Sequence, residues 1–303
     1  MTFAQKLDAI IEKNNSLLCV GLDSHFDKLP SEYRDQDHPQ FAFNKHIIDQ
    51  TYNLVCAYKP NSAFYEARGA DGVAELKMTC DYLRDHYPQI PIVLDAKRGD
   101  IGSTNDAYAH YVFDYLQADA ITLHPYLGQE AVQSFLDQSD KGIIILCRTS
   151  NPGSGEFQNR VVNTPSSTPP VGGTSRAPLK GETLSDSSLE GGGPLAVEGV
   201  SQELYKTVAQ NIVQNWNTNG NCMLVVGATY PEELAQIRTI AGDMTLLVPG
   251  IGAQGGDVEK TVKAGLNSAG KGIMISSSRS IIFSENPKKV AQKLVREINR
   301  YRS

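Results

Sequence analysis

The sequence LDAKRGDI, at Leu94–Ile101, follows directly on the apolar run Ile90–Val93. The apolar run predicts a buried strand. Because side chains alternate along a strand, Asp95 and Lys97 are expected to point to the same side. A carboxylate and an ammonium at the tip of a buried strand are costly to desolvate unless they pair or take part in a reaction. The segment therefore predicts either a structural ion pair or part of a functional site.

The same order of elements repeats along the chain, with apolar runs of strand length alternating with segments of helical periodicity. Eight strands are predicted, at Leu17–Leu22, Val55–Lys59, Pro91–Ala96, Ala118–Leu123, Gly142–Cys147, Cys222–Gly227, Met244–Val248 and Gly272–Ser276. Eight such units in 303 residues predict an α/β protein with a (β/α)8, or TIM, barrel as a single domain over residues 1–303. The alternative is a doubly wound open sheet, but no GxGxxG motif follows the first strand.

Helices are predicted between these strands, at Phe41–Tyr52, Gly72–His86, Thr104–Leu116, Ser201–Trp216 and Asp257–Ala264. Further helices are expected to begin at Pro231 and after Asn286, where proline suits the first turn. Thr2 and Gln5 have the spacing of a capping box at the start of another helix.

One segment, Asn159–Gly199, interrupts this alternation. It is rich in Pro, Gly, Ser and Thr and contains no aromatic residue. Such a composition buries too little apolar surface to offset the entropy of ordering, so we expect a flexible insertion after the fifth strand. The alternative is a lid over the active face, and the residues near Gly153–Gln158 fit that alternative better than the rest.

Composition excludes several classes of protein. The net charge of −6, without a basic cluster among aromatics, argues against a nucleic-acid partner. No apolar run reaches the roughly 20 residues of a membrane helix, and no secretion signal opens the sequence, so we expect a cytoplasmic protein without a membrane partner. The five cysteines show no CxxC spacing and are expected to be reduced core thiols, and the six histidines show no metal-ligand spacing.

Polar side chains are predicted at the ends of several strands. Asp23 follows the first strand, Lys59 ends the second, and Arg148–Gly153 follow the fifth. Because catalytic groups of a barrel lie at the carboxyl ends of its strands, these residues and Asp95 with Lys97 are expected to share one mouth.

The last two units carry the pattern of an anion site. Pro249–Gly256 is a glycine-rich loop after the seventh strand, and Ser276–Arg279 follows the eighth. Small residues let backbone amides approach an oxyanion, and an arginine grips phosphate through two donors. Loops seven and eight are the usual phosphate site of this fold.

Together these motifs resemble orotidine 5′-phosphate decarboxylase, and in particular the longer bacterial branch (type 2) of that family. The resemblance rests on the pattern Asp95-x-Lys97-x-x-Asp100, on Tyr58–Asn61, on Cys147–Gly153 and on the loop Pro249–Gln254 with Arg279. It spans the first to the eighth strand, and the insertion Asn159–Gly199 is its main departure from the family pattern.

The resemblance implies an enzyme, a carboxy-lyase, that converts orotidine 5′-monophosphate (OMP) to uridine 5′-monophosphate (UMP) and CO2 in pyrimidine biosynthesis, with no cofactor and no metal. Lys97 would be the proton donor to C6. Asp95 would hold Lys97 charged and oriented, and Lys59 would pair with Asp95.

The resemblance also implies how substrate is held. Asp23 and Asn61 would bind the ribose hydroxyls, Ser150 the pyrimidine edge, and Gln254 with Arg279 the phosphate, and Thr104 is expected among the substrate-binding residues. Asp100 would enter the active site of a second subunit, which implies a homodimer. Contacts of His124 and Arg148 with ligand stay open.

Two alternatives are left at this point. One is a related phosphate-sugar barrel enzyme, such as a hexulose-phosphate synthase or a pentose-phosphate epimerase; the hexulose enzymes share a similar Asp-x-Lys element, need a divalent metal and would lose activity on chelation. The other is a binding protein whose charged strand ends are only structural, which would bind UMP without releasing CO2 from OMP.

Overall fold

The computed structural model describes residues 1–164, 200–251 and 256–302 of the chain. Its main sheet contains eight parallel strands: β1 Leu18–Gly21, β2 Ala57–Lys59, β3 Val93–Arg98, β4 Ala120–Leu123, β5 Gly142–Arg148, β8 Cys222–Val226, β9 Leu246–Pro249 and β10 Ile273–Ser277. All eight predicted strands are therefore confirmed. Each formed where an apolar run of strand length lies between polar or glycine-containing segments.

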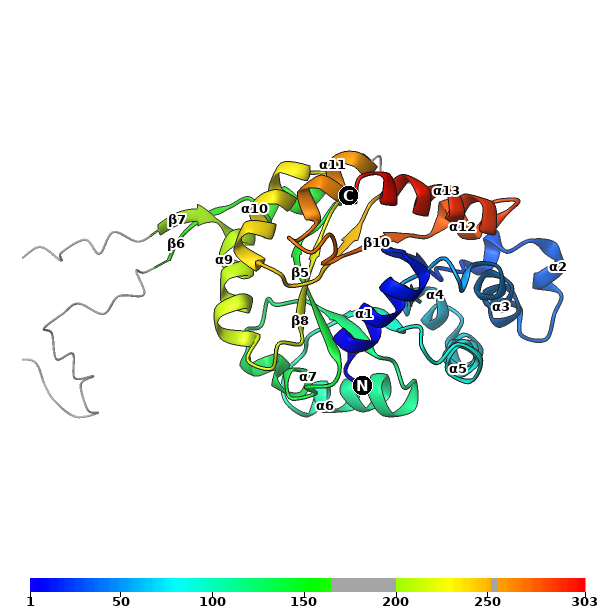
Figure 1. Ribbon diagram of the computed structural model, residues 1–303. Helices are drawn as coiled ribbons and strands as arrows, with labels where there is room; N and C mark the ends of the chain where they lie inside the picture. The colour runs from blue at the N-terminus through cyan, green and yellow to red at the C-terminus, as the bar shows by residue number, and fades with distance from the viewer. Residues whose placement is uncertain (165–199, 252–255, 303) are drawn as a thin grey trace, which may run out of the picture.

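The strands close into a (β/α)8 barrel, as predicted (Figure 1). The order of hydrogen-bonded neighbours is β2-β1-β10-β9-β8-β5-β4-β3, with every pair in this order parallel. Between β2 and β3 the barrel closes through two isolated parallel bridges, Tyr58 with Ile92 and Asn61 with Asp95. This seam lies directly beside the charged residues at the ends of both strands.

The helices surround this barrel: α1 Phe3–Asn14, α2 Ser31–Arg34, α3 Pro39–Thr51, α4 Ala63–Glu66, α5 Gly69–His86, α6 Ser103–Ala109, α7 Gln133–Leu136, α8 Gly155–Gln158, α9 Leu204–Asn211, α10 Pro231–Ala241, α11 Val258–Gly265, α12 Arg279–Ile282 and α13 Pro287–Arg300. Single π-helical segments extend α6 over His110–Tyr115 and α9 over Ile212–Trp216. The predicted capping box is present, because Thr2 Oγ1 accepts from the Gln5 amide at 3.3 Å and Gln5 Oε1 accepts from the Thr2 amide at 3.0 Å.

Two predicted boundaries around the insertion were wrong. Val161–Thr164 forms β6, which pairs antiparallel with β7, Val200–Glu203. Figure 1 shows this pair running away from the barrel. The insertion therefore begins after a strand rather than at Asn159, and the helix predicted from Ser201 starts only at Leu204. Each strand pairs with a segment about forty positions away, which local periodicity does not reveal. The rest of the predicted insertion, 165–199, lies outside the described residues.

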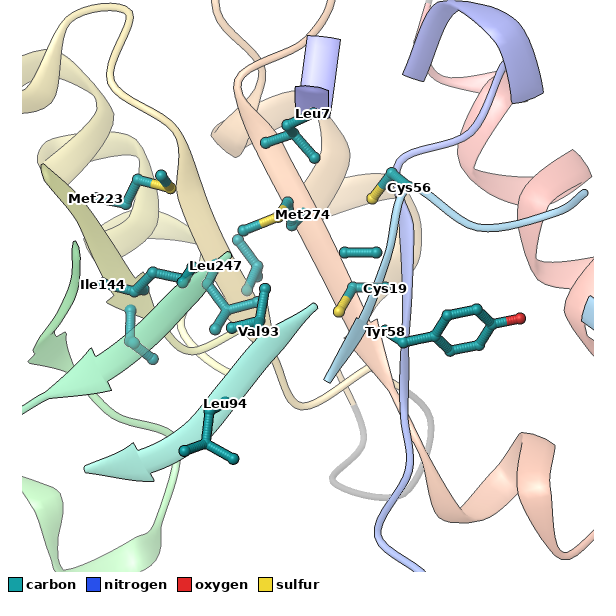
Figure 2. Packing of buried hydrophobic residues seen from close by; sticks show 14 of the residues in the cluster. Leu7, Cys19, Cys56, Tyr58, Val93, Leu94, Ile144, Met223, Leu247 and Met274 are labelled. Atoms are coloured by element: carbon teal, nitrogen blue, oxygen red, sulfur yellow. The ribbon is translucent and has the colours of Figure 1, made fainter. Parts of the chain in front are cut away.

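The interior of the barrel is apolar beneath its charged mouth. Figure 2 shows Val93, Ile144, Leu247 and Met274 gathered between the strands, with Leu7 of α1 next to Met274. Because side chains alternate, Val93 lies on the same side of β3 as Asp95, one step deeper in the barrel. Asp95 and the other charged side chains of the mouth therefore lie next to a close-packed apolar interior.

Several minor expectations concern buried groups. All five cysteines are buried and free, as predicted. Burial raises the pKa of the Cys19 thiol to about 12, so this thiol stays protonated at neutral pH. No helix in the described part of the chain is long and apolar enough to cross a membrane.

Gly72 supplies a test of how tightly the helices pack. A Cβ at this position in α5 would lie 2.0 Å from the Tyr65 carbonyl oxygen. Tyr65 cannot easily move away from α5, because its hydroxyl donates to the Leu22 carbonyl at 2.8 Å and accepts from Asn44. Alanine gains about 1 kcal/mol of helix propensity, but overpacking costs up to about 3 kcal/mol. We expect Gly72→Ala to lower the free energy of unfolding by about 2 kcal/mol.

Urea unfolding of the purified variant would measure this loss. Gly153→Ala serves as the control, because the nearest atom to its added Cβ lies 3.8 Å away. A Gly72→Ala protein as stable as the wild type would contradict the tight approach of Tyr65 to α5.

Candidate active site

A cavity of about 490 Å³ opens at the carboxyl ends of the barrel strands. It brings together six residues that the sequence analysis singled out: Asp23, Lys59, Asp95, Lys97, Ser150 and Arg279. These residues come from segments as far apart as β1 and α12, yet each follows or ends a strand. The parallel register of the barrel therefore gathers them at one mouth.

The centre of this site is a chain of alternating charges. Asp95 Oδ2 accepts from Lys59 Nζ at 2.8 Å, and Asp95 Oδ1 accepts from Lys97 Nζ at 2.6 Å. Asp95 is 9% exposed and Lys59 is 5% exposed, whereas the side chain of Lys97 is 49% exposed. Lys59, Asp95 and Lys97 are called the charged array below. Lys97 is the member of this array whose side chain faces the open cavity.

The array fixes the ionisation of its buried members. Burial alone would raise the pKa of Asp95, but Lys59 and Lys97 outweigh that effect and hold the pKa well below its usual range. Burial would likewise lower the pKa of Lys59, but Asp95 and then Asp23 reverse the effect, and the net shift is upward. Both groups are therefore charged at neutral pH.

The backbone of β3 departs from a regular strand at the array. Its register with β4 shifts between Leu94 and Arg98, and Lys97 adopts a left-handed conformation with φ +48°. Asp95 and Lys97 face the same cavity, as alternation predicted, but the irregular backbone is what brings the Lys97 ammonium back onto Asp95. Gly99 follows at φ +151°, where a Cβ would lie 2.8 Å from His124 Nε2.

The loop after β5 is held from behind by Arg148. This guanidinium is buried and donates to Glu233, to Ser154 and to Gln158 Oε1 at 3.2 Å. Gln158 also accepts from the Thr149 amide at 2.9 Å. Arg148 is absent from the lining of the cavity, whereas Thr149, Ser150 and Gln158 belong to it. Arg148 thus supports the loop that carries Ser150.

Asp23 presents an unpartnered acceptor. Its Oδ1 atom is buried and finds no hydrogen-bond donor among the described residues. Asp23 and Arg279 also border a second cavity of about 320 Å³, where Asn61 lies. A buried carboxylate oxygen without a donor is costly unless a ligand supplies one.

The loops after β9 and β10 surround the far side of the cavity. Gly250, Ile251 and Ser277–Arg279 line it, and Gly250 has φ +108°, which only glycine adopts without strain. Ser278 Oγ donates to the Gly21 carbonyl at 3.1 Å and so ties this loop to the end of β1. Gln254, predicted in the same place, lies outside the described residues.

Two predicted site residues lie away from the main cavity. Asp100 is exposed and borders a third cavity of about 340 Å³ with Lys97 and His124. Its backbone is fixed by Asn105, whose Oδ1 accepts from the Asp100 amide at 3.0 Å. Thr104 is exposed on α6 and lines none of the three cavities. Neither side chain completes the site within one copy of the chain.

Two polar residues that line the cavity, Thr122 and Ser280, were not among the residues that the sequence analysis named. Thr122 is the only polar residue of β4, and this interruption of an apolar strand was the available signal. Gln158, the last residue of the segment Gly153–Gln158 that was considered as a lid, lines the cavity and bonds Thr149. Among the described residues, no group of three His, Cys, Asp or Glu side chains is placed to hold a metal ion.

The fold and the site together define a (β/α)8-barrel protein with a charged ligand pocket at the carboxyl ends of its strands. Comparison with known proteins narrows this class. Residues 16–168 match the family model described as Orotidine 5'-phosphate decarboxylase / HUMPS family. The chain is 43% identical to the orotidine 5'-phosphate decarboxylase of Janthinobacterium sp. over 292 residues, which cover 96% of this chain and 93% of that protein.

Two further relatives span the full chain. The orotidine 5'-phosphate decarboxylase of Cupriavidus metallidurans is 41% identical over 309 residues, with 100% of this chain and 99% of the relative covered. The solved structure of Leishmania donovani OMP decarboxylase superposes with a TM-score of 0.78 at 36% identity, covering 100% of this chain and 99% of that one. The chain belongs to the orotidine 5′-phosphate decarboxylase / HUMPS family.

The depressed pKa of Asp95 predicts an acid dependence of stability. A carboxyl group whose pKa is lowered on folding contributes stability above its ordinary pKa of 3.8, and this contribution is lost as the pH falls below that value. Asp95→Asn removes the contribution at every pH. We expect the wild type to be the more stable protein at pH 7, and the difference in free energy of unfolding to shrink as the pH falls below about 4.

Urea unfolding of both proteins between pH 7 and pH 2 would measure this difference. Asp114→Asn, at an exposed position in the π-helical segment that follows α6, provides the control for a change of one surface charge. A difference that stays constant down to pH 2 would contradict the lowered pKa of Asp95.

Proposed function

We propose that this protein decarboxylates OMP to UMP and CO2 and that one barrel domain, residues 1–303, carries the activity. The observation that carries the proposal is the Asp95–Lys97 pair, with its half-exposed ammonium at the mouth of the cavity. Family membership and the names of the full-length relatives support the choice of substrate.

The proposed reaction breaks one bond and forms another at C6 of the pyrimidine. The bond between C6 and the carboxylate carbon breaks, CO2 leaves, and the electron pair stays on C6. The Lys97 ammonium then gives a proton to C6, which yields UMP, and the neutral amine takes a proton from solvent. A fixed positive charge beside C6 stabilises the developing carbanion before the proton is transferred.

Asp95 and Lys59 act on this step through Lys97. Asp95 holds the Lys97 ammonium at 2.6 Å, so the charge is in place before substrate arrives. Lys59 neutralises Asp95 from the opposite side and keeps that carboxylate ionised. Preorganised charges of this kind need no rearrangement during the reaction, which is why they stabilise a transition state effectively.

Substrate would be held by groups around this array. The unpartnered Asp23 Oδ1 suits a ribose hydroxyl donor, and Asn61 in the adjoining cavity suits the other hydroxyl. Ser150 would bind the pyrimidine edge, and Arg279 with Gln254 the phosphate. Phosphate binding far from C6 can hold the reactive geometry and thereby raise turnover.

The active unit would be a homodimer in which Asp100 enters the neighbouring site. Asp100 and Thr104 are exposed on the segment that follows β3, and the Ile101 side chain between them is also exposed. Tyr126 and Leu127 add exposed apolar surface on the adjacent loop after β4. Apolar side chains next to an exposed acid of the site fit a contact with a second copy of the chain.

Lys97→Ala tests the role of the ammonium. We expect kcat to fall by at least about a thousandfold, because both charge stabilisation and proton donation are removed. Affinity for UMP should change far less, since this ligand carries no departing carboxylate. Loss of OMP absorbance in the presence of EDTA measures turnover, and calorimetry measures UMP binding. Lys263→Ala, on the surface of α11, is the control; a Lys97→Ala enzyme within tenfold of wild type would reject the assignment.

Mixing two inactive variants tests the shared site. Lys97→Ala and Asp100→Ala chains that exchange subunits form hybrid dimers with one site in which both residues are native. Random exchange of equal amounts gives half hybrids, so about a quarter of wild-type activity should return. Native mass spectrometry would verify exchange, and mixed chains that exchange yet stay inactive would count against the contribution of Asp100 to a second site.

A further inference from the structure

We propose that Thr122 is a positioning residue that holds the Lys97 ammonium against Asp95; the proposal rests on the decarboxylase function proposed above. Thr122 lies on the inner side of β4, is 1% exposed and lines the main cavity. Its hydroxyl contacts both acidic and basic members of the array, although no charge of its own is involved.

The first contact supports the irregular backbone of β3. Leu94 pairs with Ile121 and Arg98 with Leu123, so the three residues between Leu94 and Arg98 face Thr122 alone. Within this bulge the Lys97 amide donates to Thr122 Oγ1 at 3.0 Å. The hydroxyl therefore replaces the carbonyl that a regular ladder would supply to this amide.

This support matters because the conformation of Lys97 is costly. A left-handed backbone costs a residue other than glycine roughly 1–2 kcal/mol. The bulge nevertheless turns the Lys97 side chain back toward Asp95. In a regular β3, this side chain would lie further along the strand. The Thr122 acceptor is thus one of the interactions that hold a strained residue in its productive orientation.

The second contact fixes the carboxylate. A hydroxyl has one proton to donate, and because Thr122 Oγ1 accepts from Lys97, that proton is free for Asp95 Oδ1, 2.9 Å away. The same oxygen accepts from Lys97 Nζ at 2.6 Å. These three hydrogen bonds form a closed ring that contains the Lys97 amide, the Thr122 hydroxyl, the Asp95 carboxylate and the Lys97 ammonium. In this ring, Thr122 sets the distance between Asp95 and Lys97.

Loss of the hydroxyl should act on turnover rather than on substrate affinity. A displacement of the reacting group by about 1 Å can lower a rate about a hundredfold. The described residues proposed for ribose and phosphate, Asp23, Asn61 and Arg279, follow other strands, whereas the Thr122 hydroxyl bonds Lys97 and Asp95. We expect Thr122→Val to lower kcat about a hundredfold while KM stays within about threefold.

Three variants test this role. Thr122→Val keeps the shape but removes both hydrogen bonds, whereas Thr122→Ser keeps the hydroxyl and should restore kcat to within about tenfold of wild type. Thr51→Val is the matched control, because Thr51 is also buried and bonds the Ile47 carbonyl and Tyr58, and none of these three residues lines the cavity. Its kcat should stay at the wild-type level even if its stability falls. The valine variant should also shift the acidic limb of the kcat profile to higher pH, because Asp95 loses a donor to its charged form.

A crystal structure of Thr122→Val separates this inference from the proposed function. We expect Lys97 to leave the left-handed region or its Nζ to move away from Asp95 Oδ1, whether or not the wild type turns over OMP. Failure of the decarboxylase proposal would show as a wild-type protein without OMP turnover. An unchanged Lys97–Asp95 contact in the valine structure, a valine variant with wild-type kcat, or a serine variant no better than valine would overturn the positioning role.

Discussion

The contact between the Asp95 carboxylate and its two lysines links the closure of the barrel to the charged centre of the cavity. The backbone of Asp95 closes the barrel: its amide donates to the Pro60 carbonyl at 2.9 Å, and its carbonyl accepts from Ser62 at 3.2 Å. Its side chain meanwhile joins Lys59 of β2 to Lys97 of β3. A buried carboxylate without these cations would be neutral or would disrupt the seam. The residue that closes the barrel is therefore also the residue that organises the charges.

This double role explains how a charged site can stand on a close-packed core. Val93, two residues before Asp95 on β3, packs among apolar side chains of the barrel interior (Figure 2). The low polarity below strengthens the ion pairs, and the pairs compensate for the desolvation of each charge. Residues from the segments after β5, β9 and β10 line the cavity around these charges. The site thus combines a paired charged centre with polar loop residues around it.

Much of this arrangement could be predicted from the sequence because its causes are local. Apolar runs specify the eight strands, and a polar residue at the end of each run, such as Lys59 or Asp95, falls at the mouth of any parallel barrel. The position of β7 was not predictable, because its pairing with β6 spans the insertion. Thr122 was missed for a different reason, since its function depends on a bulge in the neighbouring strand. The role proposed for Asp100 involves a second copy of the chain, so no property of one sequence segment could settle it.

The array also explains why two lysines so close to one carboxylate would take different roles. Lys59 is buried, and the negative charges of Asp95 and Asp23 raise its pKa. The Lys59 ammonium therefore keeps its proton. Lys97 lies where the main cavity meets the one that Asp100 borders, and half of its side chain is exposed. Proton donation requires an ammonium that can reach the substrate and be reprotonated by solvent. Position and exposure therefore favour Lys97 as donor, while the enclosed Lys59 is suited to keeping Asp95 ionised.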